Sequence, residues 1–194
     1  RPSALGLLCT QVWIRRNGPA PAQFLETIMK RITNALTVGT GLLALAGTGF
    51  AEDVLSVKTI GMELARDIAS AAVLACREQG YQVSAVVVDR NGNVRAAIRD
   101  DLAPRFTLQI AEEKANAVIM SGIASGAFRD SRPDIRPELN HVNGILMMQG
   151  GVPINAAGSR LGAVGVSGAP GGDKDEICAI KALEALSERL DFID

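Results

Sequence analysis

The sequence predicts a single α+β domain, in which helices pack on a five-stranded antiparallel sheet in the order helix, two strands, helix, three strands, helix. Three observations support this class. The chain has 194 residues, 47% of them hydrophobic, which suits one well-buried core and is short for two domains. Five short runs have strand composition and three longer ones have helical periodicity. The links within each group of strands are short, which favours antiparallel pairing.

Three segments have apolar residues at helical spacing, and each is predicted to form a helix with one buried face. The first, 57–78, ends before Gly80, a residue typical of the position after a helix. The second is 107–123 and the last spans about 174–190. The polar segment 125–140 is predicted to be a loop with at most a short helix. In the second helix, the side chains predicted to face solvent are Glu112, Glu113 and Lys114.

The strand-like runs fall into a pair and a group of three. The pair, 83–89 and 94–99, flanks Asn91-Gly92, which accepts the positive φ of a tight turn, so a β-hairpin is predicted here. Pro153 has no N–H to donate to a sheet, so its strand either lies at an edge or begins at this residue. The later runs are 144–148, 152–157 and 161–167.

The N-terminal region has the pattern of a secretory signal peptide. A basic start at Met29 is followed by a short apolar run and by small residues up to Ala51. We therefore expect residues 1–28 to be an upstream leader outside the fold, 29–51 to be a signal peptide, and 52–194 to be a periplasmic or secreted domain. The alternative is a membrane anchor, which needs about 20 strongly apolar residues. Threonines and glycines dilute this run, so no stable membrane span is expected after cleavage.

The charge of the predicted mature domain argues against a nucleic-acid partner. Residues 52–194 carry more acidic than basic side chains and few aromatic ones. Nucleic-acid binding depends on Lys and Arg for phosphates and on rings for stacking. We therefore expect a small molecule, and no nucleic acid, as the binding partner.

Two cysteines, Cys76 and Cys178, remain in the predicted mature domain. In an oxidising compartment they could form a disulfide. The alternative is a pair of buried thiols that pack as small hydrophobic side chains. Two cysteines far apart in sequence do not decide between these readings.

The glycine-rich stretch 162–176 raises the question of phosphate binding. It contains neither the phosphate-loop nor the dinucleotide-binding spacing of glycines. Acidic residues at the following helix start would repel a phosphate, and Asp173 and Glu176 have the spacing of a capping box. A near match to the serine-hydrolase elbow at Ser167 lacks the last glycine, and the one histidine precedes it in the sequence. The stretch therefore predicts turns and close packing.

His141 is the sole histidine, and a single imidazole without nearby partners does not make a zinc site. Haem iron, however, needs only one or two axial ligands, and His and Met both serve. This makes His141 a candidate iron ligand, together with Met147 and Met148; the alternative for the methionines is a place in the core. Arg160 is a candidate partner for carboxylates or porphyrin propionates.

Four stretches together resemble the GlcG/HbpS-like family of haem-binding domains over essentially residues 57–190. They are "VVVDRNGNVRAAIRDD", "AEEKANAV", "GGVPI" and "GAVGVSGAPGGDKDEICA". Residues that match the family pattern include Asp89, Gly92, Lys114, Gly150, Gly151 and Asp175. The resemblance implies a compact α+β domain with an antiparallel sheet, homo-oligomers, signal peptides in some members and haem binding in some.

Two hypotheses about function follow. The first is an exported small-molecule binding protein for haem or a related tetrapyrrole. The second is a small-molecule enzyme, an isomerase or a haem- or carboxylate-processing activity, that uses Lys174, Asp175 and Arg160. The enzyme requires these three side chains to line a concave site with Ser167.

Overall fold

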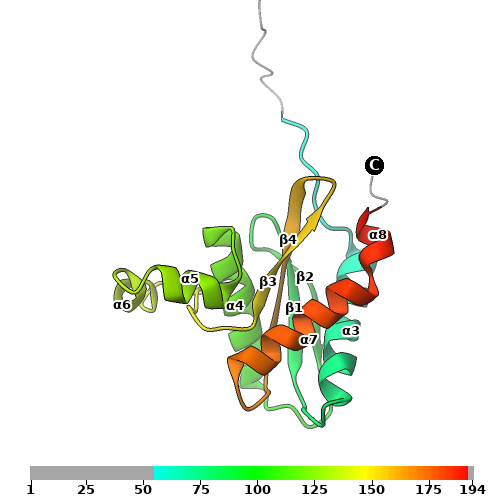
Figure 1. The fold of residues 1–194 in the computed structure, drawn as a ribbon, viewed down its shortest axis with the longest axis horizontal. Coiled ribbons are helices and arrows are strands. Elements are labelled where there is room, and N and C mark those ends of the chain that lie inside the picture. Colours follow the sequence, from blue (N-terminus) through cyan, green and yellow to red (C-terminus); the bar gives the residue numbers. More distant parts are fainter. Residues whose placement is uncertain (1–54, 192–194) are drawn as a thin grey trace, which may run out of the picture. The chain divides into compact units, whose positions relative to one another are not determined.

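The computed structural model describes residues 55–191, so the predicted leader and signal peptide lie outside the described residues. The described part contains a four-stranded sheet and helices on both of its faces (Figure 1). The elements in chain order are α3 (Met62–Arg77), β1 (Ser84–Asp89), β2 (Val94–Arg99), α4 (Phe106–Ser121), α5 (Ser125–Ser131), α6 (Arg136–Leu139), β3 (Gly151–Ala156), β4 (Ser159–Ser167), α7 (Gly172–Ala185) and α8 (Ser187–Asp191).

The sheet is antiparallel throughout, with strand order β2-β1-β4-β3. This confirms the predicted α+β class and the antiparallel pairing. The predicted number of five strands is wrong, because 144–148 forms no strand. The N–H of Leu146 donates to the carbonyl of Glu113 on α4, and Met147 packs into a small cluster beside that helix. A short apolar run predicts burial, and burial against a helix gives the same pattern as burial in a sheet.

Two layers of helices enclose the sheet. The alternation of side chains along β1 sends Ala85 and Val87 into a large cluster with α3 and α7. Val86 and Val88 point the other way, into a smaller cluster with α4. All six residues of β1 are buried because both faces of this strand are covered. In Figure 1, α7 crosses the face of the sheet opposite to α4.

The predicted hairpin is confirmed, with β1 and β2 joined through Asn91 and Gly92. Gly92 has a φ of 86°, in the left-handed region that glycine adopts without strain. Asp89 closes the turn, because its carboxylate accepts hydrogen bonds from the backbone N–H groups of Asn91 and Asn93 at 2.8 and 3.0 Å. The loop therefore has a fixed conformation.

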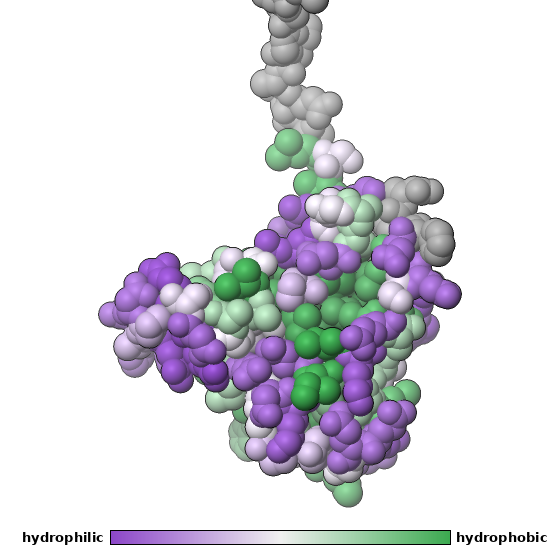
Figure 2. Space-filling model, viewed as in Figure 1, coloured by the Kyte–Doolittle hydropathy of each residue, from purple (hydrophilic) through white to green (hydrophobic). Residues whose placement is uncertain are grey.

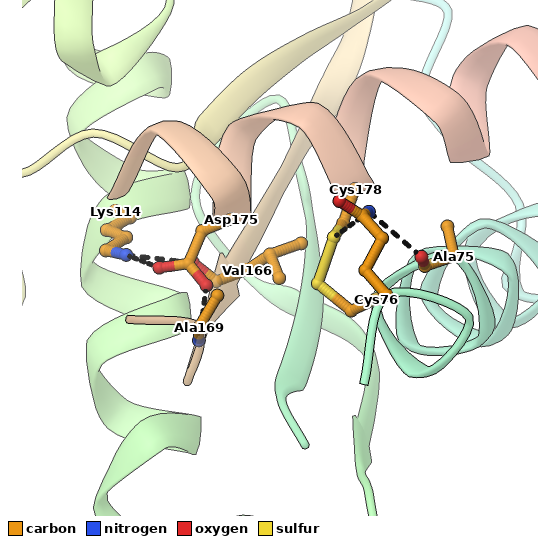
Figure 3. Close-up of a disulfide and its surroundings, with 8 residues drawn as sticks. Ala75, Cys76, Lys114, Val166, Ala169, Asp175 and Cys178 are labelled. Carbon is orange, nitrogen blue, oxygen red and sulfur yellow. Dashed lines mark hydrogen bonds and ion pairs between the residues drawn. A yellow bond between two sulfur atoms is a disulfide. The ribbon is translucent and has the colours of Figure 1, made fainter. Parts of the chain in front are cut away.

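The cysteines form a disulfide, which decides between the two readings of the sequence. Cys76 on α3 and Cys178 on α7 are bonded, and both are fully buried (Figure 3). The bond links the two helices that cover one face of the sheet, across a sequence separation of 102 residues.

The last helix begins differently from the capping box that the sequence predicts. Gly171 occupies the capping position of α7, and neither Asp173 nor Glu176 forms a cap there. Asp175 instead accepts a hydrogen bond from the backbone N–H of Ala169 at 2.9 Å. The helix also ends earlier than predicted, at Ala185, and a separate short helix, α8, follows.

Apolar side chains lie exposed on α7 as well as beneath it. Ile177 and Ile180 are 44% and 41% exposed, and Figure 2 shows an apolar area where α7 crosses the sheet. Such an area on a small domain is a common place for a protein contact. The expected homo-oligomer stays a prediction.

Candidate functional site

A buried ion pair joins the two layers of helices. Lys114 of α4 places its Nζ 2.8 Å from Oδ2 of Asp175 on α7, and it also donates to the carbonyl of Val166 at 2.9 Å (Figure 3). The other carboxylate oxygen of Asp175 accepts from Ala169. The two charged side chains are only 1% and 4% exposed. The ammonium of Lys114 and both carboxylate oxygens of Asp175 therefore have hydrogen-bond partners.

Burial shifts the pKa of both members of the pair. Desolvation lowers the pKa of Lys114 and raises the pKa of Asp175, while their mutual attraction opposes both shifts. The shifted values do not make the pair an acid-base catalyst, because a substrate has no access to either group. The pair holds α4, β4 and α7 in register.

The double glycine of "GGVPI" fits closely over this ion pair. A Cβ at Gly150 would lie 2.8 Å from Nζ of Lys114 and from the carbonyl oxygen of Val166. A Cβ at Gly151 would lie 2.4 Å from the backbone carbonyl oxygen of Lys114. Gly150 also has a φ of 125°. Any side chain at these positions would separate the strand from the helix, which explains why glycines stand here.

A pocket of about 320 Å³ lies at a different place, beside the C-terminal half of α4. It is open to solvent on one side and combines apolar side chains with three asparagines. The β1–β2 turn, α4 and the segment after α6 each contribute to its wall. The lining residues are Asn91, Gly92, Asn116, Ile119, Met120, Asn143, Gly144 and Ile145.

Asn116 is the central polar group of this pocket. Its Nδ2 donates to the carbonyl of Gly144 at 3.0 Å, which fixes the orientation of the amide. Its Oδ1 is buried and accepts no hydrogen bond within the described residues. The same oxygen faces Gly92, where an added Cβ would lie 3.1 Å away. Asn116 thus connects the two turns that border the pocket.

Two of the predicted haem-binding residues lie close to this pocket. His141 is exposed and stands two residues before Asn143, which lines the pocket. Arg160 donates from Nη1 to the carbonyl of Ile119, another lining residue, at 3.2 Å. Arg160 of β4 therefore reaches the α4 side of the pocket, and His141 lies in the segment that leads into its wall.

The two predicted methionines have opposite environments. Met147 is 2% exposed and packs with Ala117 and Phe128, as the core reading of the sequence expects. Met148 is 44% exposed. The two side chains separate at a tight turn, in which the N–H of Met148 donates to the carbonyl of Leu146 at 2.8 Å.

The residues of the enzyme hypothesis do not line the pocket. Asp175 is enclosed in the ion pair, and Ser167 is 5% exposed at the end of β4. Lys174 places its Nζ 5.9 Å from the ring centroid of Tyr81, while Arg160 of β4 donates to the carbonyl of Ile119 near the end of α4. Within residues 55–191 there is also no group of three or more His, Cys, Asp or Glu side chains placed to hold a metal ion.

Lys114 is buried, so the prediction that its side chain faces solvent is wrong. Lys114 follows Ala111 by three residues and precedes Val118 by four, and both of these apolar residues are buried on the same face of α4. Helical spacing could therefore have found it, but the charge of lysine argued for exposure. No spacing or motif in the sequence indicates that Asn116 lines a pocket.

Comparison with known proteins gives one family. The family described as "Haem degrading protein HbpS-like" matches residues 60–184. A crystal structure of a double mutant of HbpS from Streptomyces reticuli is 32% identical, covering 70% of this chain and 92% of that one with a TM-score of 0.65. Protein ORFY from Klebsiella pneumoniae is 27% identical, covering 71% and 97% with the same TM-score.

A third structure, that of a PduOC–haem complex, is 20% identical and shares the fold, covering 66% of this chain and 94% of that one with a TM-score of 0.57. No curated protein matches the sequence. Among the described residues, no helix has the length and apolar character to cross a membrane.

Proposed function

Because the chain belongs to the HbpS-like family of haem-degrading proteins, we propose that it is an exported protein that binds haem or a related tetrapyrrole. The pocket beside α4 is the proposed site. The haem complex of a protein with the same fold supports this choice of ligand.

The observation that carries the proposal is the combination of side chains at this pocket. Ile119, Met120 and Ile145 offer apolar contacts to the face of a macrocycle. His141, exposed next to this wall, is the proposed axial ligand of the iron. Arg160 at the end of α4 is the proposed partner of a propionate. A pocket of about 320 Å³ can enclose part of a porphyrin and leaves the rest of the ring exposed to solvent.

The disulfide supports the export part of the proposal. Disulfides persist in oxidising compartments and are rare in the reducing cytosol. The bond between Cys76 and Cys178 is therefore consistent with a periplasmic or secreted location. The signal sequence that would direct this export, 29–51, lies outside the described residues.

Titration of the full chain with hemin tests the binding proposal. We expect a shifted Soret band at about micromolar protein, a changed spectrum of the complex in His141→Ala, and weaker binding in Arg160→Ala. Arg66→Ala is the matched control, because this exposed arginine belongs to α3 on the opposite face of the sheet. Absence of any Soret shift contradicts haem binding. An unchanged spectrum in His141→Ala contradicts the assigned ligand and directs attention to Met148, Met147 or Tyr81.

The description of the family favours a second candidate function, degradation of the bound haem. Such a reaction needs an oxidant, and hydrogen peroxide is a suitable probe. Loss of the Soret band and release of iron, faster with the protein than with hemin alone, would support it. Equal rates with and without protein leave binding as the function.

A further inference from the structure

Two Asn-Gly pairs border the pocket, Asn91-Gly92 and Asn143-Gly144. In such a pair the backbone nitrogen of the glycine can attack the side-chain carbonyl carbon of the asparagine. Glycine favours this reaction because it has no side chain to hinder the approach and because its backbone is flexible. The structure sets the rate, since the attacking nitrogen must leave its hydrogen bonds and rotate toward the side chain.

The first pair is held in place. The N–H of Gly92 donates to the carbonyl of Asp89 at 3.0 Å. The N–H of Asn91 donates to the carboxylate of Asp89 at 2.8 Å. Attack by the nitrogen of Gly92 requires the turn to open and both hydrogen bonds to break, so Asn91 is protected although its side chain is exposed.

In the second pair, the two backbone N–H groups are not restrained in this way. Asn143 is exposed, and within residues 55–191 the N–H groups of Asn143 and Gly144 donate to no acceptor. The space around Gly144 is open, because a Cβ at this position would meet nothing within 4 Å. Gly144 accepts a hydrogen bond from Asn116 at its carbonyl, and the turn around it is closed by one longer bond of 3.3 Å, from the N–H of Ile145 to the carbonyl of Val142. The attacking nitrogen is therefore free.

We propose that Asn143 is a site of spontaneous deamidation. The backbone nitrogen of Gly144 loses its proton to solvent and bonds to Cγ of Asn143, and ammonia leaves as a succinimide ring closes. Water then opens the ring at either carbonyl, which gives aspartate or isoaspartate. The net change is addition of one water and loss of one ammonia, with no oxidant or reductant.

The product alters the pocket. A carboxylate replaces a neutral amide on the wall, next to the segment that carries His141. Isoaspartate also lengthens the main chain by one carbon immediately before Gly144, whose carbonyl is the partner of Asn116. We therefore expect weaker binding of an anionic ligand such as hemin; this consequence rests on the proposed function, whereas the reaction itself does not.

Peptide mapping by mass spectrometry tests the reaction. The full chain is incubated at mildly alkaline pH, native or in urea, and fragment spectra assign each conversion. In the native protein Asn143 should convert at least about ten-fold faster than Asn91, because two hydrogen bonds protect the latter. In urea the two rates should converge. Equal native rates, or a native Asn143 that is stable while it converts in urea, overturn the proposal.

Two matched variants separate the reaction from its consequence. Asn143→Gln should abolish conversion at this position, because ring closure by glutamine is much slower, and Asn91→Gln should leave conversion at Asn143 unchanged. Aged wild type should bind hemin more weakly than fresh protein, and aged Asn143→Gln should match its own fresh sample. If Asn143 deamidates and hemin binding does not change, only the expected weakening of hemin binding is overturned. Absence of hemin binding in fresh protein contradicts the proposed function and leaves the mass-spectrometric result valid.

Discussion

The two faces of the sheet are held by different means. On the side of α3 and α7, a large apolar cluster is reinforced by the buried disulfide between Cys76 and Cys178. On the side of α4, the apolar cluster is smaller, and the polar side chains of Lys114 and Asn116 contact the neighbouring segments instead. Apolar contacts are non-directional and tolerate small shifts, whereas a buried charge requires one particular partner. The α4 side is therefore the more sensitive to single substitutions.

The ion pair gives the largest expected effect. Lys114→Met leaves the carboxylate of Asp175 buried without its charged partner, and we expect a loss of about 3–5 kcal/mol in the free energy of unfolding. Removal of both charges in Lys114→Met/Asp175→Leu should recover much of this loss, because no unpaired charge remains. Urea unfolding of the two single variants and the double variant measures the coupling. Additive losses in the double variant would show that the pair does not act as a unit.

The disulfide gives the next effect, on the opposite face. Cys76→Ala/Cys178→Ala removes a link across 102 residues, and we expect a loss of about 2–4 kcal/mol. The loss should be milder than that from an unpaired buried charge, because the apolar cluster around the two positions remains. Unfolding of the wild type with and without a thiol reductant gives the same comparison. The double-alanine variant is the control, because a reductant should not change its stability. If the reductant also leaves the stability of the wild type unchanged, the disulfide contributes nothing to it.

The same contrast explains what the sequence could predict. The helices, the β1–β2 hairpin and the strands β3 and β4 follow from periodicity and turn residues, which are local signals. The capping box at Asp173 and Glu176 failed locally, whereas the other failures involve contacts between distant segments. The run 144–148 is apolar because Met147 packs beside Ala117 on α4, and no local pattern distinguishes that burial from a sheet.

The candidate site was predictable only in part. His141 and Arg160 were found as chemically suited side chains, but their nearness to one pocket depends on the approach of the segment after α6 to the end of α4. The pocket wall combines apolar side chains with asparagines and glycines such as Asn116 and Gly144, whose types are common in turns and carry no signal of a site. The sequence names candidate groups, and the fold decides which of them meet.

The smallest expected effect concerns an ion pair on the α3 side, between Arg77 and Asp100. The hydrogen bond from Arg77 is the main cause of a lowered pKa of Asp100, against an opposing effect of desolvation. A carboxyl group whose pKa is lower in the folded state stabilises the fold fully above its unfolded pKa of about 3.9. This stabilisation is lost as the pH falls through the folded pKa. Arg77 is 48% exposed, so the contribution is screened by solvent and should be smaller than that of the buried pair.

Asp100→Asn tests this pH dependence. We expect the variant to lose stability at pH 7 and to approach the wild type below pH 4, so that the difference between them shrinks as the solution is acidified. Asp101→Asn is the matched control, because Asp101 is exposed and its carboxylate accepts no hydrogen bond within residues 55–191. A difference between wild type and Asp100→Asn that stays constant from pH 7 to pH 3 would mean that Asp100 acts through packing rather than charge. In that case the α3 side would depend on apolar burial and the disulfide alone, without a contribution from the Arg77–Asp100 ion pair. The two faces of the sheet would then differ more clearly in what stabilises them.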